Sequence, residues 1–344
     1  MMELVRLGMT GLMVSRIGLG GIPMQRLGEA EAIALVRRCL DLGINFIDTA
    51  NSYTTSEGFI GKAVTGRPRN ELVLATKSTS RTTQGLKRHL ALSLERLGVE
   101  KIDLYQFHAV DDFDTLRGVI GGGDAMAVVR EARDEGKIGH IGITSHSPEV
   151  AKEAAASGCF ETLMFPFNLV SPEAAAEIIP LCRQHDVGFI AMKPMGGGAL
   201  ENASIAMKFL LQFPVVVPVV GMEQLSHAEE LARIAAADLG LTADEKREIE
   251  RTAAEIETTY CRQCDYCQPC LESIPIAHVL LFQRYLRCFP PNLVFQGWVA
   301  QAMEKAEDCT ECGECEGRCP FRLPIREMFK ENIALFRRLK DSAS

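Results

Sequence analysis

Short apolar runs alternate with longer amphipathic stretches along residues 1–255 of the chain. The runs are rich in β-branched and aromatic residues and predict eight strands, at 16–20, 45–50, 72–77, 103–108, 138–145, 162–168, 188–194 and 215–221. The stretches 29–42 and 84–97 predict helices, because their apolar residues recur three and four positions apart. A further helix is expected at 228–237. Ser147-Pro148 and Ser171-Pro172 each predict a helix start, with serine as the N-cap and proline at the first helical position.

Eight strands that alternate with helices over about 250 residues have the length and order of a (β/α)8 barrel. A doubly wound open sheet is the alternative. The glycine-rich stretch GLGGIP at 18–23 does not complete the G-x-G-x-x-G fingerprint that such a sheet often carries. We therefore predict the α/β fold class, with a (β/α)8 TIM barrel at residues 1–255 and a smaller, mainly helical module at residues 256–344.

The overall composition excludes several classes of partner. Of the 344 residues, 47% are hydrophobic, and the net charge of −8 gives no electrostatic basis for binding nucleic acid or an anionic membrane. The longest apolar run, 213–222, contains two prolines and is too short to span a bilayer. The N-terminal residues lack the uninterrupted apolar segment of a signal peptide. We expect a cytoplasmic protein with no nucleic-acid or membrane partner.

Polar side chains stand at the ends of three consecutive predicted strands. Asp48 ends the second strand, and Tyr53 follows five residues later in the next loop. Lys77 ends the third strand and His108 ends the fourth. In a barrel such residues face the active site. A lysine would lower the pKa of the tyrosine from about 10 towards the working range, the aspartate would hold the lysine charged, and the histidine would orient a carbonyl oxygen.

These four residues, in the settings FIDTANSY, LATKS and LYQFHAV, resemble the catalytic tetrad of the aldo-keto reductases. The resemblance spans residues 3–235 and fills all four tetrad positions. It implies a barrel that binds a nicotinamide cofactor in extended form. It also implies that Tyr53 is the general acid when hydride passes from the nicotinamide to a carbonyl carbon, and the general base in the reverse direction.

Other strand ends resemble the cofactor contacts of the same family. Gly20 and Gly21 follow the first strand, Thr144 and Ser145 end the fifth, Lys193, Pro194 and Met195 end the seventh, and Gly221, Met222 and Gln224 belong to the loop after the eighth. The loop after the eighth strand is a natural phosphate site, because backbone N–H groups and a helix N-terminus favour anions. The glycine run at 196–198 is open to two interpretations, a flexible turn or a cofactor lid.

The sequence departs from the family pattern around the cofactor. Glu223 and Gln224 stand where members selective for NADPH usually carry Lys or Arg. Leu231 stands at a position that is often Asn, and Met164 at one that is often Gln. NADP is the cofactor that the family implies, and NAD is the alternative.

Nine of the twelve cysteines lie within residues 261–319. Residues 309–320 read CTECGECEGRCP, which is the C-x2-C-x2-C-x3-C-P run of bacterial ferredoxins. A second run, CRQCDYCQPC at 261–270, has a shorter last gap and lacks the proline. Because the fourth cysteine of such a run ligates the other cluster in two-cluster ferredoxins, we predict two [4Fe-4S] clusters with crossed ligands. One is held by Cys261, Cys264, Cys267 and Cys319, and the other by Cys309, Cys312, Cys315 and Cys270.

The irregular second run leaves the number of clusters, one or two, open. Zinc is the alternative metal, since it also binds C-x2-C pairs, although these runs contain no histidine. Cys288 lies between the runs and is expected to be a buried residue outside the clusters. A helix on either side of Pro290-Pro291 could dock this module on the barrel. One subgroup of aldo-keto reductases resembles the whole arrangement, with a ferredoxin-like iron–sulfur tail after the barrel.

Two functions are consistent with these patterns. The first is an NAD(P)H-dependent oxidoreductase that interconverts a small-molecule carbonyl compound (an aldehyde, ketone or sugar) and its alcohol. In it Tyr53 is the general acid/base, and the attached clusters are structural or supply electrons. The second is a redox-sensing or electron-transfer protein that uses the barrel as a cofactor-binding platform and acts with a redox partner protein.

Overall fold

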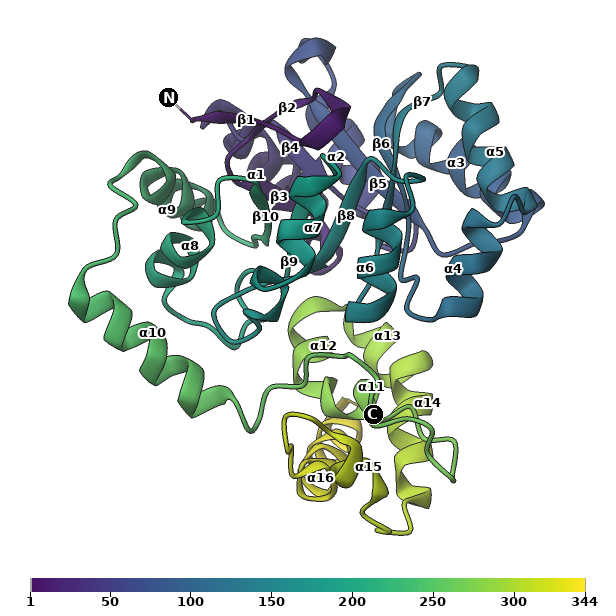
Figure 1. The fold of residues 1–344 in the computed structure, drawn as a ribbon, viewed down its shortest axis with the longest axis vertical. Helices are drawn as coiled ribbons and strands as arrows, with labels where there is room; N and C mark the ends of the chain where they lie inside the picture. The colour runs from purple at the N-terminus through teal and green to yellow at the C-terminus, as the bar shows by residue number, and fades with distance from the viewer. Residues whose placement is uncertain (1, 344) are drawn as a thin grey trace.

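Eight parallel strands form a closed barrel at the centre of the structure (Figure 1). This computed structural model describes residues 2–343. The barrel strands are β3 (Gly18–Gly20), β4 (Phe46–Asp48), β5 (Val73–Ser78), β6 (Ile102–Phe107), β7 (Ile138–Thr144), β8 (Thr162–Pro166), β9 (Gly188–Met192) and β10 (Val216–Gly221). Each pairs with the next, and β10 closes the barrel against β3. All eight overlap strands predicted from the sequence, so the predicted barrel is confirmed.

One end of the barrel is closed by the N-terminal segment. Strands β1 (Leu4–Arg6) and β2 (Met13–Ser15) form an antiparallel pair, and the short 3-10 helix η1 (Gly8–Thr10) lies between them. Leu7 packs with the side chains that fill the barrel interior, among them Phe46 and Ile190. It lies against Gly188 at the start of β9, where an added Cβ would be 2.8 Å from the Leu7 side chain. The open end is therefore the one where the strands finish.

Helices surround the barrel as its outer layer (Figure 1). They are α1 (Glu29–Asp41), α2 (Ser56–Val64), α3 (Thr83–Leu97), α4 (Phe113–Ile120), α5 (Asp124–Asp134), α6 (Pro148–Ala156), α7 (Ile178–Gln184), α8 (Ala203–Leu211) and α9 (Leu225–Ala236), with 3-10 helices η2 (Ile22–Arg26), η3 (Arg69–Glu71) and η4 (Glu173–Ala175). The helices predicted at 29–42, 84–97 and 228–237 are confirmed as α1, α3 and α9.

The two predicted serine caps have different outcomes. Ser147 caps α6, because its hydroxyl accepts a hydrogen bond from the N–H of Val150 at 3.5 Å. The helix start predicted at Ser171-Pro172 is wrong, since only the three-residue turn η4 forms there. The main chain of Ser171 pairs instead with that of Asn168 in an isolated bridge. The Asn168 side chain accepts two N–H bonds within this loop, so a local turn competes successfully with the helix.

The remainder of the chain forms a helical part with its own apolar core. Helix α10 (Ala243–Ile256) leads from the barrel to α11 (Ile276–Leu280), α12 (Phe282–Cys288), α13 (Pro291–Phe295), α14 (Trp298–Lys305), η5 (Ala306–Asp308), α15 (Glu314–Arg318) and α16 (Ile325–Ala343). Figure 1 shows α11–α16 gathered at one end of the barrel. Phe282, Val299 and Met303 are fully buried in a cluster separate from the barrel core.

The pair of helices predicted around Pro290-Pro291 is only partly correct. The break exists, because α12 ends at Cys288 and α13 begins at Pro291. However, each side consists of two short helices rather than one, and Gly297 separates α13 from α14. Across residues 2–343, none of the helices has the length and apolar character needed to cross a membrane.

Candidate active site

The four residues of the predicted tetrad meet at the open end of the barrel. Asp48 is the last residue of β4, Lys77 lies near the end of β5, and His108 directly follows β6. The Lys77 ammonium forms an ion pair with the Asp48 carboxylate and donates a second hydrogen bond to the Thr49 carbonyl at 2.8 Å. The side chains of Lys77 and Asp48 are only 2% and 6% exposed, so the pair lies in a poorly hydrated site where its attraction is strong.

Tyr53 lies over this ion pair. The Lys77 Nζ atom is 5.2 Å from the centre of the Tyr53 ring. The ring of His108 meets the Tyr53 ring edge to face, with 5.9 Å between the centroids and an interplanar angle of 83°. The structure therefore brings a phenol, an imidazole and a buried lysine together around one point, which is an arrangement suited to moving a proton.

Burial changes the expected acidity of Tyr53. Burial raises the pKa of the Tyr53 hydroxyl above its usual value of 10, and the charge of Lys77 opposes this increase. The sequence-based expectation that Lys77 brings the pKa below 10 is therefore wrong in the net direction, because desolvation outweighs the lysine. Burial lowers the pKa of Lys77, but the Asp48 carboxylate raises it by more, so the net pKa lies above 10.5. Lys77 therefore remains protonated at neutral pH.

His108 is neutral at physiological pH. Burial lowers the pKa of its imidazole well below 6.5, and the Lys77 charge lowers it further. Its carbonyl accepts a hydrogen bond from Arg81 at 2.6 Å, which holds the start of the loop after β6. Among the described side chains, residues 2–342, none forms a hydrogen bond with the buried His108 Nδ1 atom. A neutral imidazole carries one N–H and can donate one hydrogen bond.

Sequence reasoning missed a fifth polar residue beneath the tetrad. Gln106 is fully buried on β6, and its side-chain amide donates a hydrogen bond to the second oxygen of Asp48 at 2.9 Å. Asp48 thus bonds Lys77 through one oxygen and Gln106 through the other. The available signal was a glutamine two residues before His108, within the otherwise apolar run LYQF. A single polar residue in a strand was not enough to assign it a role.

A second polar pair beside the tetrad was also missed. Asp111 lies in the loop after β6. One of its carboxylate oxygens accepts a 2.6 Å hydrogen bond from the main-chain N–H of His146, and the other lies 3.3 Å from Nδ1 of the His146 ring. Burial lowers the pKa of His146 to about 4, and Lys193 lowers it as well. Although burial alone would raise it, the pKa of Asp111 falls to about 2 because His146 faces it. At neutral pH this pair is a carboxylate bonded to a neutral imidazole.

The predicted cofactor residues lie around the same end of the barrel. Gly20 and Gly221 are paired at the ends of β3 and β10, and a Cβ added to Gly21 would be 2.5 Å from the Ser56 hydroxyl. The other predicted contacts are Thr144, Ser145, Lys193, Pro194, Met195, Met222 and Gln224. Met222 is fully buried, with its sulfur 3.8 Å from that of Cys39. Its side chain therefore belongs to the core, and only its backbone is free to face a cofactor.

The C-terminal part of the chain covers this end of the barrel. Helix α12 packs against η2, where Arg26 donates a hydrogen bond to the Arg287 carbonyl at 2.6 Å. Arg287 in turn donates a hydrogen bond to the carbonyl of Gly198, in the loop after β9. Lys193, at the start of the same loop, donates a 2.9 Å hydrogen bond to Gln263. Residues from both parts of the chain therefore surround the tetrad.

The glycine run at 196–198 is explained by this packing. All three glycines have positive φ angles, +59°, +65° and +92°, which side chains rarely adopt. A Cβ added to Gly197 would be 2.4 Å from Cδ of Arg284, and one added to Gly198 would be 3.1 Å from a nitrogen of Arg287. The run is thus a tight turn pressed against α12, rather than an open flexible turn.

Four of the predicted ligand cysteines line one hollow in the C-terminal part. They are Cys270, Cys309, Cys312 and Cys315, which include three thiols of one run and the last thiol of the other. Burial raises the pKa of Cys264, and the charge of Cys319 raises it further, so the crossed pair Cys264 and Cys319 are also neighbours. Within residues 2–343, no group of three or more His, Cys, Asp or Glu side chains is arranged to hold a single metal ion.

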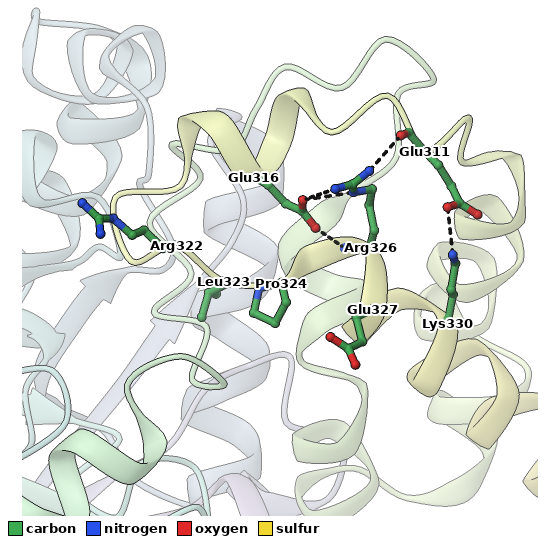
Figure 2. A pocket seen from close by; sticks show the side chains of 8 residues that line it. All are labelled: Glu311, Glu316, Arg322, Leu323, Pro324, Arg326, Glu327 and Lys330. Carbon is green, nitrogen blue, oxygen red and sulfur yellow. Dashed lines mark hydrogen bonds and ion pairs between the residues drawn. The ribbon is translucent and has the colours of Figure 1, made fainter.

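A polar groove adjoins this hollow on the outside (Figure 2). Arg326 crosses it and donates hydrogen bonds to Glu316 at 2.7 and 3.0 Å and to the Glu311 carbonyl at 3.4 Å. Lys330 pairs with the Glu311 carboxylate at 2.8 Å. These bonds tie α16 to the segment 311–316, which carries two of the predicted ligands, Cys312 and Cys315. Four of the charged side chains that line the groove are thus paired with each other, and these bonds brace this segment against α16.

Comparison with known proteins agrees with the barrel fold. The model of the aldo/keto reductase family, a class of NAD(P)-dependent oxidoreductases with this barrel, matches residues 16–205. The chain belongs to the aldo/keto reductase family. It is 29% identical over 212 residues to the probable aldo-keto reductase 1 of Glycine max, which covers 56% of this chain and 60% of that protein.

Two solved structures share the barrel. Aldo-keto reductase AKR11C1 from Bacillus halodurans, in its holo form, is 25% identical with a TM-score of 0.64, covering 73% of this chain and 96% of that one. An aldo/keto reductase from Klebsiella pneumoniae in complex with NADP and acetate is 22% identical with a TM-score of 0.62, covering 73% of this chain and 95% of that one. The second likeness is one of fold.

Proposed function

We propose that this protein interconverts a carbonyl compound and its alcohol with a nicotinamide cofactor, and that Tyr53 is the proton donor. The observation that carries the proposal is the convergence of Tyr53, His108 and the Lys77–Asp48 ion pair at the open end of the barrel. Family membership supports an NAD(P)-dependent oxidoreductase. The aldehyde, ketone or sugar that serves as substrate is a small molecule that enters from this end.

Each residue has a distinct part in the reaction. The cofactor, when bound, supplies a hydride to the carbonyl carbon. The Tyr53 hydroxyl donates its proton to the carbonyl oxygen, and the resulting tyrosinate is stabilised by the nearby Lys77 ammonium. Neutral His108 donates its hydrogen bond to the same oxygen and fixes the carbonyl in place. Asp48, held by Gln106, keeps Lys77 oriented and charged. In the oxidation direction Tyr53 accepts the alcohol proton.

The cofactor is NADP, with NAD as the alternative. The bound NADP of the Klebsiella pneumoniae relative supports this choice. Backbone at Gly20, Gly21 and Gly221 gives a side-chain-free approach at the β3–β10 edge. Glu223 forms an ion pair with Arg26 at 3.2 Å, so its charge is partly compensated at the position where a 2′-phosphate would be bound. Titration with both cofactors distinguishes the two.

We assign residues 1–255 to the barrel domain and residues 256–344 to a ferredoxin-type iron–sulfur module. The separate apolar core of the C-terminal helices supports this division. The four cysteine thiols that line the hollow, Cys270 and those of the Cys309–Cys315 run, are the donor set of one [4Fe-4S] cluster, and Cys261, Cys264, Cys267 and Cys319 would hold a second. A zinc ion requires its thiolates within about 4 Å of each other, because each Zn–S bond is only ~2.3 Å. A cubane spaces them more widely, since each thiolate binds a different iron.

The decisive experiment compares Tyr53→Phe with Tyr105→Phe in full-length protein purified anaerobically. Tyr105 is buried among the core side chains between strands and helices, so its variant controls for loss of a phenol elsewhere in the barrel. With NADPH or NADH and a panel of aldehydes, ketones and sugars, Tyr53→Phe is expected to lower kcat about a hundred- to ten-thousand-fold. Equal turnover by both variants, on every substrate that the wild type reduces, would refute the proposal.

A second candidate function is redox sensing, and one observation favours it. Burial lowers the pKa of Lys193, and a negative charge on Cys261 acts to raise it, so the two side chains are close to each other. A predicted cluster ligand therefore borders the predicted cofactor site. In a sensor, cofactor binding would change the electron paramagnetic resonance spectrum of the reduced cluster even in Tyr53→Phe. A spectrum that does not respond to cofactor, together with wild-type carbonyl turnover, excludes the sensor.

A further inference from the structure

Arg284 extends from the C-terminal module into the catalytic end of the barrel. It lies on α12, and its side chain is pressed against Gly197 in the loop after β9. Its charge lowers the pKa of Tyr53 against the effect of burial, and it acts in the same direction on His146. Three elements of the barrel mouth, the loops after β4, β7 and β9, thus face this one guanidinium.

Lys193 is a second cation beside Arg284. It follows β9, has a positive φ of +57° and donates its hydrogen bond to Gln263, a neutral partner. Lys193 begins the tight turn that Arg284 presses on, since the Gly196 N–H donates a 2.8 Å hydrogen bond to the Lys193 carbonyl and Gly197 follows. Burial lowers the pKa of Lys193 well below 10.5, and the charge of Arg284 lowers it further. Among the side chains of residues 2–342, no carboxylate forms an ion pair with either of them. Asp111, the carboxylate whose charge acts on Lys193, is already hydrogen-bonded by His146 and Ser145.

Two neighbouring basic side chains without a carboxylate partner, both half-buried, form a region of positive potential at the barrel mouth, where a bound anion would raise the pKa of Lys193 and keep it charged. Such an arrangement is costly unless an anion completes it. Burial raises the pKa of the Cys288 thiol, and Arg284 opposes this increase through its charge and a hydrogen bond to that thiol. A guanidinium presents a planar set of N–H donors suited to the oxygens of a phosphate or carboxylate.

We propose that Arg284 is an anion-binding residue of the active site, acting with Lys193, and that the C-terminal module thereby completes the site of the barrel. This inference rests on the proposed function. The ligand group is a phosphate or a carboxylate, which has two sources. It belongs either to the pyrophosphate of the cofactor or to an acidic group on the carbonyl substrate.

The test uses full-length protein purified anaerobically and three variants. Arg284→Gln removes the charge, and Arg284→Lys retains it. Arg338→Gln removes an exposed arginine from α16, far along the chain from the site, and controls for net charge. Thermal unfolding of each variant shows whether the module stays folded. Dissociation constants are measured for NADPH and for ADP-ribose, which contains the pyrophosphate without the nicotinamide. Turnover is measured on benzaldehyde and carboxybenzaldehyde, which differ only in a carboxylate.

A cofactor source predicts that Arg284→Gln weakens both NADPH and ADP-ribose about ten- to hundred-fold, the range of a lost charge-assisted hydrogen bond. A substrate source predicts unchanged nucleotide affinity and a similar fall in kcat/KM for carboxybenzaldehyde alone. In either case Arg284→Lys recovers part of the loss and Arg338→Gln matches the wild type. Affinities and kcat/KM within twofold of the wild type in both arms overturn the inference. Wild-type protein that binds neither nucleotide would instead refute the proposed function, so the two failures are distinguishable.

Discussion

Replacement of Gly197 by alanine tests whether the module has to press against the barrel mouth. Gly197 has a φ of +65°, and an added Cβ would lie 2.4 Å from Cδ of Arg284. Carbon atoms in contact are normally 3.5–4.0 Å apart, so the arginine has to retreat by about 1 Å or more. A displacement of that size can cost about a hundred-fold in rate when the group acts on a reaction.

Gly98 provides a matched control. It has the same φ of +65° at the end of α3, but a Cβ added there meets no atom within 4 Å. Alanine at either position lowers the free energy of unfolding by about 1–2 kcal/mol, because an L side chain is strained at this φ. It also restricts the unfolded chain, which offsets about 0.4–1 kcal/mol of that loss. Gly98→Ala should therefore reduce stability slightly and leave function intact. Gly197→Ala should show the same strain plus the displacement of Arg284.

The assay is fluorescence titration of NADPH, together with kcat/KM and thermal unfolding of each variant. Gly197→Ala should bind the cofactor or turn over an acidic substrate at least about ten-fold more weakly than Gly98→Ala, with a similar unfolding temperature. If the two variants behave alike in both binding and turnover, the contact between α12 and the loop after β9 has no bearing on the site.

Three further predictions follow from the site and the module. Because burial raises the pKa of Tyr53 above 10, the rate of alcohol oxidation should still be rising with pH at pH 10, and a plateau near pH 8 in initial rates would contradict this. Cys315→Ser should remove about four iron atoms by iron and sulfide analysis, whereas Cys288→Ser should remove none. Arg326→Ala should speed loss of cluster absorbance in air or chelator, since it frees Glu316 and the segment beside it; a rate equal to wild type would show that the groove does not brace the cluster.

The barrel was accessible from the sequence because its signals are local and repeated. Eight apolar runs at regular spacing, each followed by a helical pattern, leave few alternatives once parallel pairing is required. The N-terminal pair β1 and β2 gave no such signal, because neither strand is followed by a helical pattern and only the 3-10 helix η1 lies between them. The helix predicted at Ser171 failed for a local reason, because Asn168 satisfies the backbone groups that a helix would have used.

The tetrad could be located from the sequence because each member lies at the end of a strand or in the loop after it, but the acidity of Tyr53 could not be predicted. Burial sets the net direction of the pKa of Tyr53, and burial depends on what covers the barrel mouth. Arg284 and Gln263 lie far from the tetrad in sequence and approach it only through the docking of the module. Gln106 was hidden differently, as one polar residue within an apolar strand whose purpose appears only beside Asp48.

The segment around Cys261 joins the module to the barrel through three side chains. Tyr260 lies 3.5 Å from the Asn168 amide, Arg262 bonds Glu173 and the Val170 carbonyl at 2.8 Å, and Gln263 holds Lys193. All three flank one predicted cluster ligand. When Cys261 binds iron its neighbours are fixed, and when it does not, this connection loses an anchor. Cluster occupancy is therefore expected to control how firmly Lys193 and α12 are held over Tyr53, whether or not electrons pass between cluster and cofactor.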